Sequence, residues 1–424
     1  MLLVLAGLVF VACGTDSAVG PGSARTEIAA PTAAASATPG PAIRDPAGVQ
    51  DLLDRVAEAM VAGDTATVAA LVADPADDFG RRWQERATNM ASLPFSSYGL
   101  ELDADLHDLA SDSVRARFSE PVQVVAVLER HALEGFDETG PAEESLFLTL
   151  VERDGAWRVA GDQDAEAFGL ISVDHLWDQG PVVLSAGDRV RALHHPGTPN
   201  IAAIVQQAEQ AVDDIVRRWP LDWPGRVPVI IPSSQDELGE LLHVTFDLSN
   251  FVAFATATPS GELGSYQLTG VRIVVNPDKF VDRSAESRRL TLLHELLHVA
   301  TRNVAGPYVP NWLEEGLAQV LGEQRSTTGT RLLDAVVDDE LALPRDGQFT
   351  SGDRDRIFLS YQSAWSFVDW LVDRHGADDV ADFYLAIGDG DQEPGTEPWH
   401  IDEAARRVFD ATLEELIGQW AASR

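Results

Sequence analysis

Residues 291–298 read TLLHELLH within a longer stretch of helical pattern, and they decide how the second half of the chain is interpreted. His294 and His298 are four residues apart, so both side chains project from one face of a helix and can share one tetrahedral zinc ion. Glu295 is offset by about 100° around the helix, which places its carboxylate beside the metal as a water-activating base and not as a third ligand. The alternative is a pair of core histidines, but burying them on a Leu-rich helix without a metal would need costly polar compensation.

A third protein ligand is expected soon after this helix, because a zinc site needs one. Residues 306–307 (Gly-Pro) break the helix, and Asn311 can cap a new one. The new helix carries Glu314 and Glu315. Two adjacent carboxylates on one helix point about 100° apart, so only one of them can serve. The spacing alone leaves both open.

The HELLH helix, the break and residues 310–318 (PNWLEEGLA) resemble the gluzincin zinc metallopeptidases, in particular the peptidase MA-like group. The resemblance covers roughly residues 181–424, and its strongest part is residues 291–319. In that family the Glu directly before the Gly is the third ligand, which implies Glu315 here. The resemblance also implies that Gly316 lets the two helices approach closely.

Further site residues are implied only by this resemblance. In several gluzincins an acidic residue four positions after the ligand Glu orients the first His, and Gln319 stands at that position here. Residues 271–275 (VRIVV) match the edge strand on which an extended substrate pairs, although an ordinary sheet strand is an equal alternative. Tyr361 opens a downstream helix, where related enzymes have a Tyr whose hydroxyl bonds the developing oxyanion. A half-buried packing Tyr is the other interpretation.

The N-terminus predicts export. Residues 2–12 form an apolar run that is too short to cross a bilayer and fits the core of a signal peptide. Residues 10–14 (FVACG) resemble a bacterial lipobox, which predicts a signal over residues 1–13 with lipidation at Cys13. A plain secretory signal with an incidental cysteine is the alternative. Residues 14–45 are rich in Ala, Thr, Ser, Pro and Gly, a composition that predicts a disordered tether.

Composition excludes several classes of function. The chain of 424 residues has a formal net charge of -37, which makes nucleic-acid binding improbable. Hydrophobic residues make up 45%, as in a globular protein. Cys13 is the only cysteine, so internal disulfides, a Cys nucleophile and a Cys-ligated metal in the folded part are all excluded.

The chain predicts two folded regions, both of α+β class. Residues 46–180 read as helices followed by long strands and resemble the NTF2-like family in element order and in the closing hairpin DGAWRVAG. No convergent polar set is apparent there, and the role of this region is left open. Residues 181–424 read as a sheet followed by an almost wholly helical part, which gives a zincin-like metallopeptidase domain after a curved-sheet domain.

The remaining histidines are interpreted as structural. The adjacent pair His194-His195 diverges on any regular element, and the others are isolated in sequence: His107, His131, His175, His243, His375 and His400.

The sequence therefore predicts zinc-dependent hydrolysis of peptide bonds in a peptide or protein substrate at the extracytoplasmic face of a membrane, reached through the lipid anchor alone. Two alternatives stay open. One is a catalytically silent binding or sensing lipoprotein, and the other is a zinc amidase acting on cell-wall material. The sequence leaves the oligomeric state open.

Overall fold

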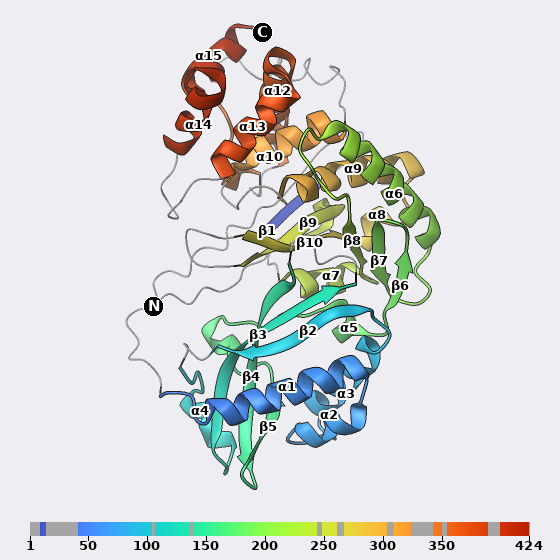
Figure 1. The fold of residues 1–424 in the computed structure, drawn as a ribbon, viewed down its shortest axis with the longest axis vertical. Coiled ribbons are helices and arrows are strands. Elements are labelled where there is room, and N and C mark those ends of the chain that lie inside the picture. Colours follow the sequence, from blue (N-terminus) through green and yellow to red (C-terminus); the bar gives the residue numbers. More distant parts are fainter. Residues whose placement is uncertain are drawn as a thin grey trace.

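The computed structural model describes residues 9–13, 41–103, 107–134, 140–243, 248–260, 267–302, 309–323, 342–349, 354–388 and 399–423. Most of the predicted tether and the Gly-Pro pair at residues 306–307 lie outside these ranges. Figure 1 shows a curled antiparallel sheet with its helices at one end of the molecule, a helical group at the other end, and a second sheet between them. The predicted α+β class is confirmed at this level.

The first region is built on a four-stranded antiparallel sheet in the order β2-β3-β4-β5, with helices packed against it. Its helices are α1 (Pro46–Ala62), α2 (Thr65–Leu71), α3 (Asp78–Met90), α4 (Asp112–Arg117), η1 (Glu166–Phe168) and α5 (Leu176–Gln179). Its strands are β2 (Phe95–Leu102), β3 (Val122–Leu133), β4 (Ala142–Arg153) and β5 (Ala156–Gly161). Gly63 ends α1 in the left-handed region at φ 65°, where a Cβ would be strained. Asp154 and Gly155, both at positive φ, form the predicted hairpin turn.

The second region is built on a mixed six-stranded sheet in the order β1-β9-β10-β8-β7-β6. Its strands are β1 (Val9–Cys13), β6 (Val183–Ala186), β7 (Val190–His194), β8 (Val227–Ile231), β9 (Ala253–Ser260) and β10 (Gln267–Val275). Strands β7, β8 and β10 run parallel, and the other pairings are antiparallel. Of the two alternatives for residues 271–275, the structure has the ordinary sheet strand, because β9 folds back along the outer side of β10 and places it inside the sheet.

Residues 9–13, predicted as the end of the export signal, form strand β1 along the outer side of β9, with Val11 opposite Ala255. Figure 1 shows this strand beside β9 and below α9. Lipidation at Cys13 stays a prediction. Within the described residues, the helices are all too short or too polar to span a bilayer.

Helices cover the second sheet and continue beyond it. They are α6 (Ile201–Arg218), α7 (Gln235–Leu242), η2 (Leu248–Asn250), α8 (Pro277–Phe280), α9 (Ala285–Arg302), α10 (Asn311–Leu317), the π-helical segment η3 (Ala318–Gly322), η5 (Asp346–Gln348), α12 (Arg354–His375), α13 (Ala377–Gly388), α14 (Trp399–Phe409) and α15 (Leu413–Ala422). One apolar core joins the sheet, α6, α9 and the C-terminal helices. Asn311 is the first residue of α10, and its backbone N–H donates to Asp346, so it does not act as the predicted side-chain cap.

Candidate metal centre

Helix α9 carries the two predicted histidines side by side in the core. The rings of His294 and His298 lie 4.9 Å apart between centroids, and each residue is 1% exposed. The helix around them is apolar on both sides, with Leu293, Leu296 and Leu297 fully buried. Because this burial leaves the rings without water, their nitrogens must be satisfied by protein groups or by an ion.

Helix α10 brings Glu315, and not Glu314, to this pair. Glu315 Oε2 lies 3.2 Å from His294 Nε2, and Glu315 Oε1 lies 3.8 Å from His298 Nε2. Glu314 points elsewhere, since its Oε1 accepts a hydrogen bond of 3.3 Å from the Tyr384 hydroxyl. Its Oε2 lies 3.9 Å from the guanidinium of Arg302. Neighbouring residues on a helix diverge by about 100°, and the structure resolves which carboxylate faces the histidines.

The chemistry of this donor set fits zinc. Ligand atoms about 2.0–2.1 Å from a tetrahedral ion stand roughly 3.3 Å from one another, and the observed separations of 3.2 and 3.8 Å are close to that. The buried His298 Nε2 makes no hydrogen bond, which is costly for a group of this kind unless it binds an ion. Two imidazole nitrogens and a carboxylate are a ligand set that zinc commonly takes.

A carboxylate that the sequence did not indicate orients His294. Glu323 Oε1 lies 2.8 Å from His294 Nδ1, so the Nδ1–H donates to Glu323 and the ring is held with its Nε2 facing Glu315. The acidic partner expected at position 319 is therefore supplied from position 323. Glu323 directly follows η3 and lies four residues, about one helical turn, beyond Gln319.

Glu295 is fully buried next to the donor set, and its carboxylate has no side-chain partner among the described residues, with only the backbone of Ala255 beside it. Burial raises the pKa of Glu295 to about 8, and the charge of Glu315 adds to the rise while that of His294 opposes it. Burial alone would lower the pKa of His294, but Glu315 and Glu323 raise it to about 10. Burial holds the pKa of His298 well below its usual range. An unpaired carboxylate with a raised pKa is the form that a general base takes in a dry site.

Two glycines let the helices around the site pack closely. A Cβ on Gly316 would lie 2.7 Å from the carbonyl oxygen of Ala364 in α12. A Cβ on Gly322 would lie 2.8 Å from the carbonyl oxygen of Leu293 in α9. The close approach expected at Gly316 therefore occurs against α12, and Gly322 provides the contact with the histidine helix.

Tyr361 lies in α12 and is 8% exposed, within the same apolar core as α9. Its ring packs edge-on against Phe349 at 5.1 Å between centroids. Its role at an oxyanion stays a prediction.

Among the other histidines, His195 Nε2 pairs with Glu237 at 2.6 Å, which agrees with a structural role. His131 and His175, which are isolated in the sequence, come together in the fold. Their rings meet at 4.9 Å, although 44 positions of the sequence separate them, and no local motif could have shown it.

Comparison with known proteins gives little. No protein-family model matches the chain, and no curated protein does. Among solved structures, a variant of an M1 zinc metallopeptidase from Deinococcus radiodurans is similar, with 13% identity and a TM-score of 0.29. The similarity covers 64% of this chain and 58% of that one, so the chain spans less than two thirds of that protein's length. A TM-score this low does not establish a shared fold.

Proposed function

We propose that this protein is a zinc-dependent peptidase of the gluzincin type, with His294, His298 and Glu315 as metal ligands and Glu295 as the catalytic base. The observation that carries the proposal is the combination of a buried His-His-Glu donor set with an unpaired buried carboxylate one residue away on the same helix. A purely structural cluster would pair that carboxylate, because leaving it unpaired costs stability.

The chain's own residues divide the work of hydrolysis. A zinc ion held by the three ligands supplies a Lewis acid and lowers the pKa of water to about 7. Glu295 accepts the proton of the attacking water and passes it to the leaving amine. Glu323 fixes the tautomer of His294, so that its Nε2 stays a lone-pair donor. The apolar surroundings keep bulk water away and strengthen each of these interactions.

The position of β9 supports an extended peptide as substrate. Its outer edge accepts an antiparallel strand, since β1 pairs along it from Val9 to Cys13. The Glu295 carboxylate lies beside the backbone of Ala255 in the same strand. A peptide added along this edge would place a backbone carbonyl near the donor set, by the usual strand-addition mode.

We also propose that the protein acts at the extracytoplasmic face, anchored through a lipid on Cys13. Cleavage before Cys13 would remove residues 9–12 and free most of the β9 edge that β1 covers. The strongly acidic chain, at a formal net charge of -37, does not favour nucleic acid as a partner.

Two measurements test the proposal. Elemental analysis is expected to show about one zinc per chain fewer in Glu315→Ala than in wild type, and no loss in Glu314→Ala. Replacing Glu295 by Gln is expected to keep the zinc and reduce hydrolysis of a peptide panel by about 10²–10⁴-fold. A folded wild type that takes up no zinc refutes the metal centre. Retained zinc with no hydrolysis of any peptide favours the silent binding lipoprotein, and hydrolysis of cell-wall amides alone favours the amidase.

A further inference from the structure

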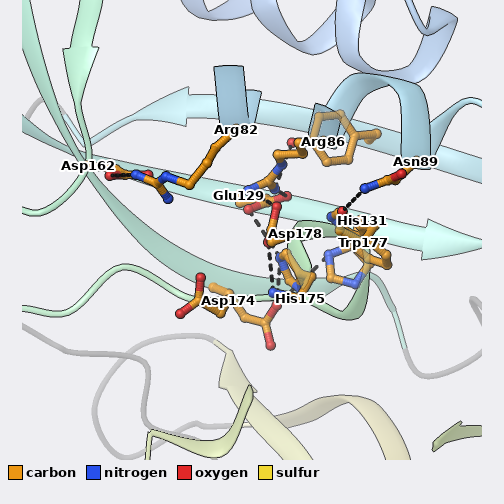
Figure 2. A network of polar contacts seen from close by, with 12 residues as sticks. Arg82, Arg86, Asn89, Glu129, His131, Asp162, Asp174, His175, Trp177 and Asp178 are labelled. Atoms are coloured by element: carbon orange, nitrogen blue, oxygen red, sulfur yellow. Dashed lines mark hydrogen bonds and ion pairs between the residues drawn. The ribbon is translucent and has the colours of Figure 1, made fainter. Parts of the chain in front are cut away.

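The concave face of the first sheet holds a second buried polar cluster, which is independent of the centre described above. Glu129 and His131 are two residues apart on β3, so they share one face of the sheet. Glu144 on β4 is the direct cross-strand partner of Glu129. His175 directly precedes α5 and completes the group. Figure 2 shows Glu129, His131 and His175 converging below α3.

Four atoms of this cluster face one another without a hydrogen bond. They are Glu129 Oε2, His131 Nδ1, Glu144 Oε2 and His175 Nε2, all buried. His175 Nε2 lies 3.2 Å from the Glu129 oxygen and 3.6 Å from the Glu144 oxygen. His131 Nδ1 lies 4.0 Å from the Glu144 oxygen. His175 and Glu129 are close enough to form an ion pair, but Glu144 Oε2 and His131 Nδ1 have no partner among the described residues within hydrogen-bond distance. Each such buried atom costs about 1–3 kcal/mol, which an ion bound among the four atoms would relieve.

The remaining atoms of the cluster are held in place by neighbouring residues. Arg86 donates to Glu129 Oε1 at 2.6 Å, and Arg272 donates to Glu144 Oε1 at 2.5 Å. Each carboxylate is thus fixed through one oxygen and offers the other to the centre. The His175 ring stacks on Trp177 at 4.4 Å between centroids. Ligands of protein metal sites are oriented in this way by a surrounding shell of hydrogen bonds.

The charges of the cluster leave room for a cation. Two carboxylates directly opposite on neighbouring strands repel each other, and here both are buried. Among the described charged groups, Glu129, Glu144 and Asp178 face Arg86, Arg272 and His175, so a bound divalent cation would take the place of a proton on His175.

We propose that Glu129, His131, Glu144 and His175 form a second metal site, which takes zinc or a similar divalent transition metal. The separations of 3.2–4.0 Å between donor atoms suit tetrahedral coordination, and two imidazoles favour such a metal over calcium or magnesium. A cavity of about 70 Å³ lined by His131 and His175 gives the ion a route inward, because it can hold more than one water.

The site joins the two regions of the chain. Arg272, which holds Glu144, comes from β10 of the second sheet, and the cavity is lined from both sides, by Trp177 and by Leu193 and Ile230. A metal bound here stabilises the whole junction, because it binds the folded arrangement and not the unfolded chain.

The test is zinc stoichiometry in a protein whose first centre has been removed. The His294→Ala/His298→Ala variant is loaded with zinc, desalted and analysed for metal, and its folding is checked by circular dichroism. We expect about one zinc per chain, lost when His131→Gln/His175→Gln is added. Glu144→Gln serves as a second variant if the double substitution unfolds the protein. His243→Gln is the matched control, since His243 pairs with Asp174 beside the same cavity but is not a ligand.

Cobalt loading gives a second readout, because a tetrahedral nitrogen and oxygen site has a characteristic visible absorption. A folded His294→Ala/His298→Ala variant that binds neither metal overturns the proposal and leaves an ion network in which a proton on His175 is the missing cation. Zinc that persists after the substitutions at positions 131 and 175 overturns it as well. Neither result bears on the catalytic centre, so the two proposals fail separately.

Discussion

Replacing Gly322 by Ala tests whether the spacing between η3 and α9 maintains the catalytic centre. The new Cβ would lie 2.8 Å from the Leu293 carbonyl oxygen and 3.4 Å from the Cα of His294. Both are backbone atoms of a buried helix, so no flexible side chain can move aside. Ordinary contact begins at 3.4 Å, and η3 must therefore move away from α9 by about 0.6 Å, the difference between 3.4 and 2.8 Å.

Two effects follow from this shift. Overpacking of this kind costs about 1–3 kcal/mol of stability. The same movement carries Glu323, the next residue in the chain, away from His294 and lengthens their 2.8 Å hydrogen bond to roughly 3.4 Å, beyond the useful range. Loss of a partner that orients a metal-bound His weakens metal affinity by about 10–100-fold.

The assay combines urea unfolding with calorimetric zinc titration of the same preparation. Gly418→Ala in α15 is the matched control, because its Cβ would meet no atom within 4 Å. There the substitution should stabilise the protein by about 0.5–1 kcal/mol and leave zinc affinity unchanged. If Gly322→Ala shows wild-type zinc affinity and a stability change like that of the control, the spacing argument and the role of Glu323 are both refuted.

Three further predictions concern charged residues. Glu323→Gln should weaken zinc affinity by about 10–100-fold with little change in unfolding, and calorimetry measures both; unchanged affinity would contradict the orienting role. In zinc-free protein, the pKa of Glu295 is raised to about 8 from 4.5. The stability that its protonation contributes is therefore fully present below pH 4.5 and is lost as the pH rises toward 8. Glu295→Gln lacks this loss and should unfold at higher urea than wild type at pH 8, by up to about 1.4 kcal/mol per pH unit, with equal midpoints at pH 8 as the contrary result. Arg86→Met removes one partner of a buried pair and should cost about 3–5 kcal/mol, whereas Arg81→Met, whose partner Asp78 is exposed, should cost about 0–1 kcal/mol; equal costs would show that the buried pair is not important.

Local patterns in the sequence were sufficient for most elements of the fold. Strand β8 (Val227–Ile231) is a short β-branched run, and helix α6 (Ile201–Arg218) follows an apolar repeat that its sequence shows plainly. Both signals are short-range, since a β-branched run or an apolar repeat of 3.6 residues depends only on near neighbours. The pairing of His294 with His298 belongs to the same class, because a helix fixes the geometry of residues four apart.

Features that depend on distant pairing or on irregular turns could not be predicted in this way. The order of strands in a sheet is not written in any one strand, and this is why the sequence could not decide between an edge and an inner position for residues 271–275. Glu323 was missed because it lies beyond the motif, at the end of η3, where no pattern in the sequence indicates a residue that faces His294. The cluster of Glu129, His131, Glu144 and His175 draws on two strands and a loop, so its members are adjacent only after the chain has folded.

The two clusters differ in one respect, and it is the reason why the proposed catalysis belongs to only one of them. Glu295 at the first centre has no side-chain partner among the described residues, and burial raises its pKa, so its carboxylate is a stronger base than an ordinary one. In the second cluster burial alone would raise the pKa values of both carboxyls, but Arg86 holds that of Glu129 far below its usual range and Arg272 holds that of Glu144 at about 2. Carboxylates so acidic are poor bases, and their second oxygens are already fixed by arginine. The second cluster is therefore suited to hold an ion and stabilise the junction, while the chemistry requires the free carboxylate of the first.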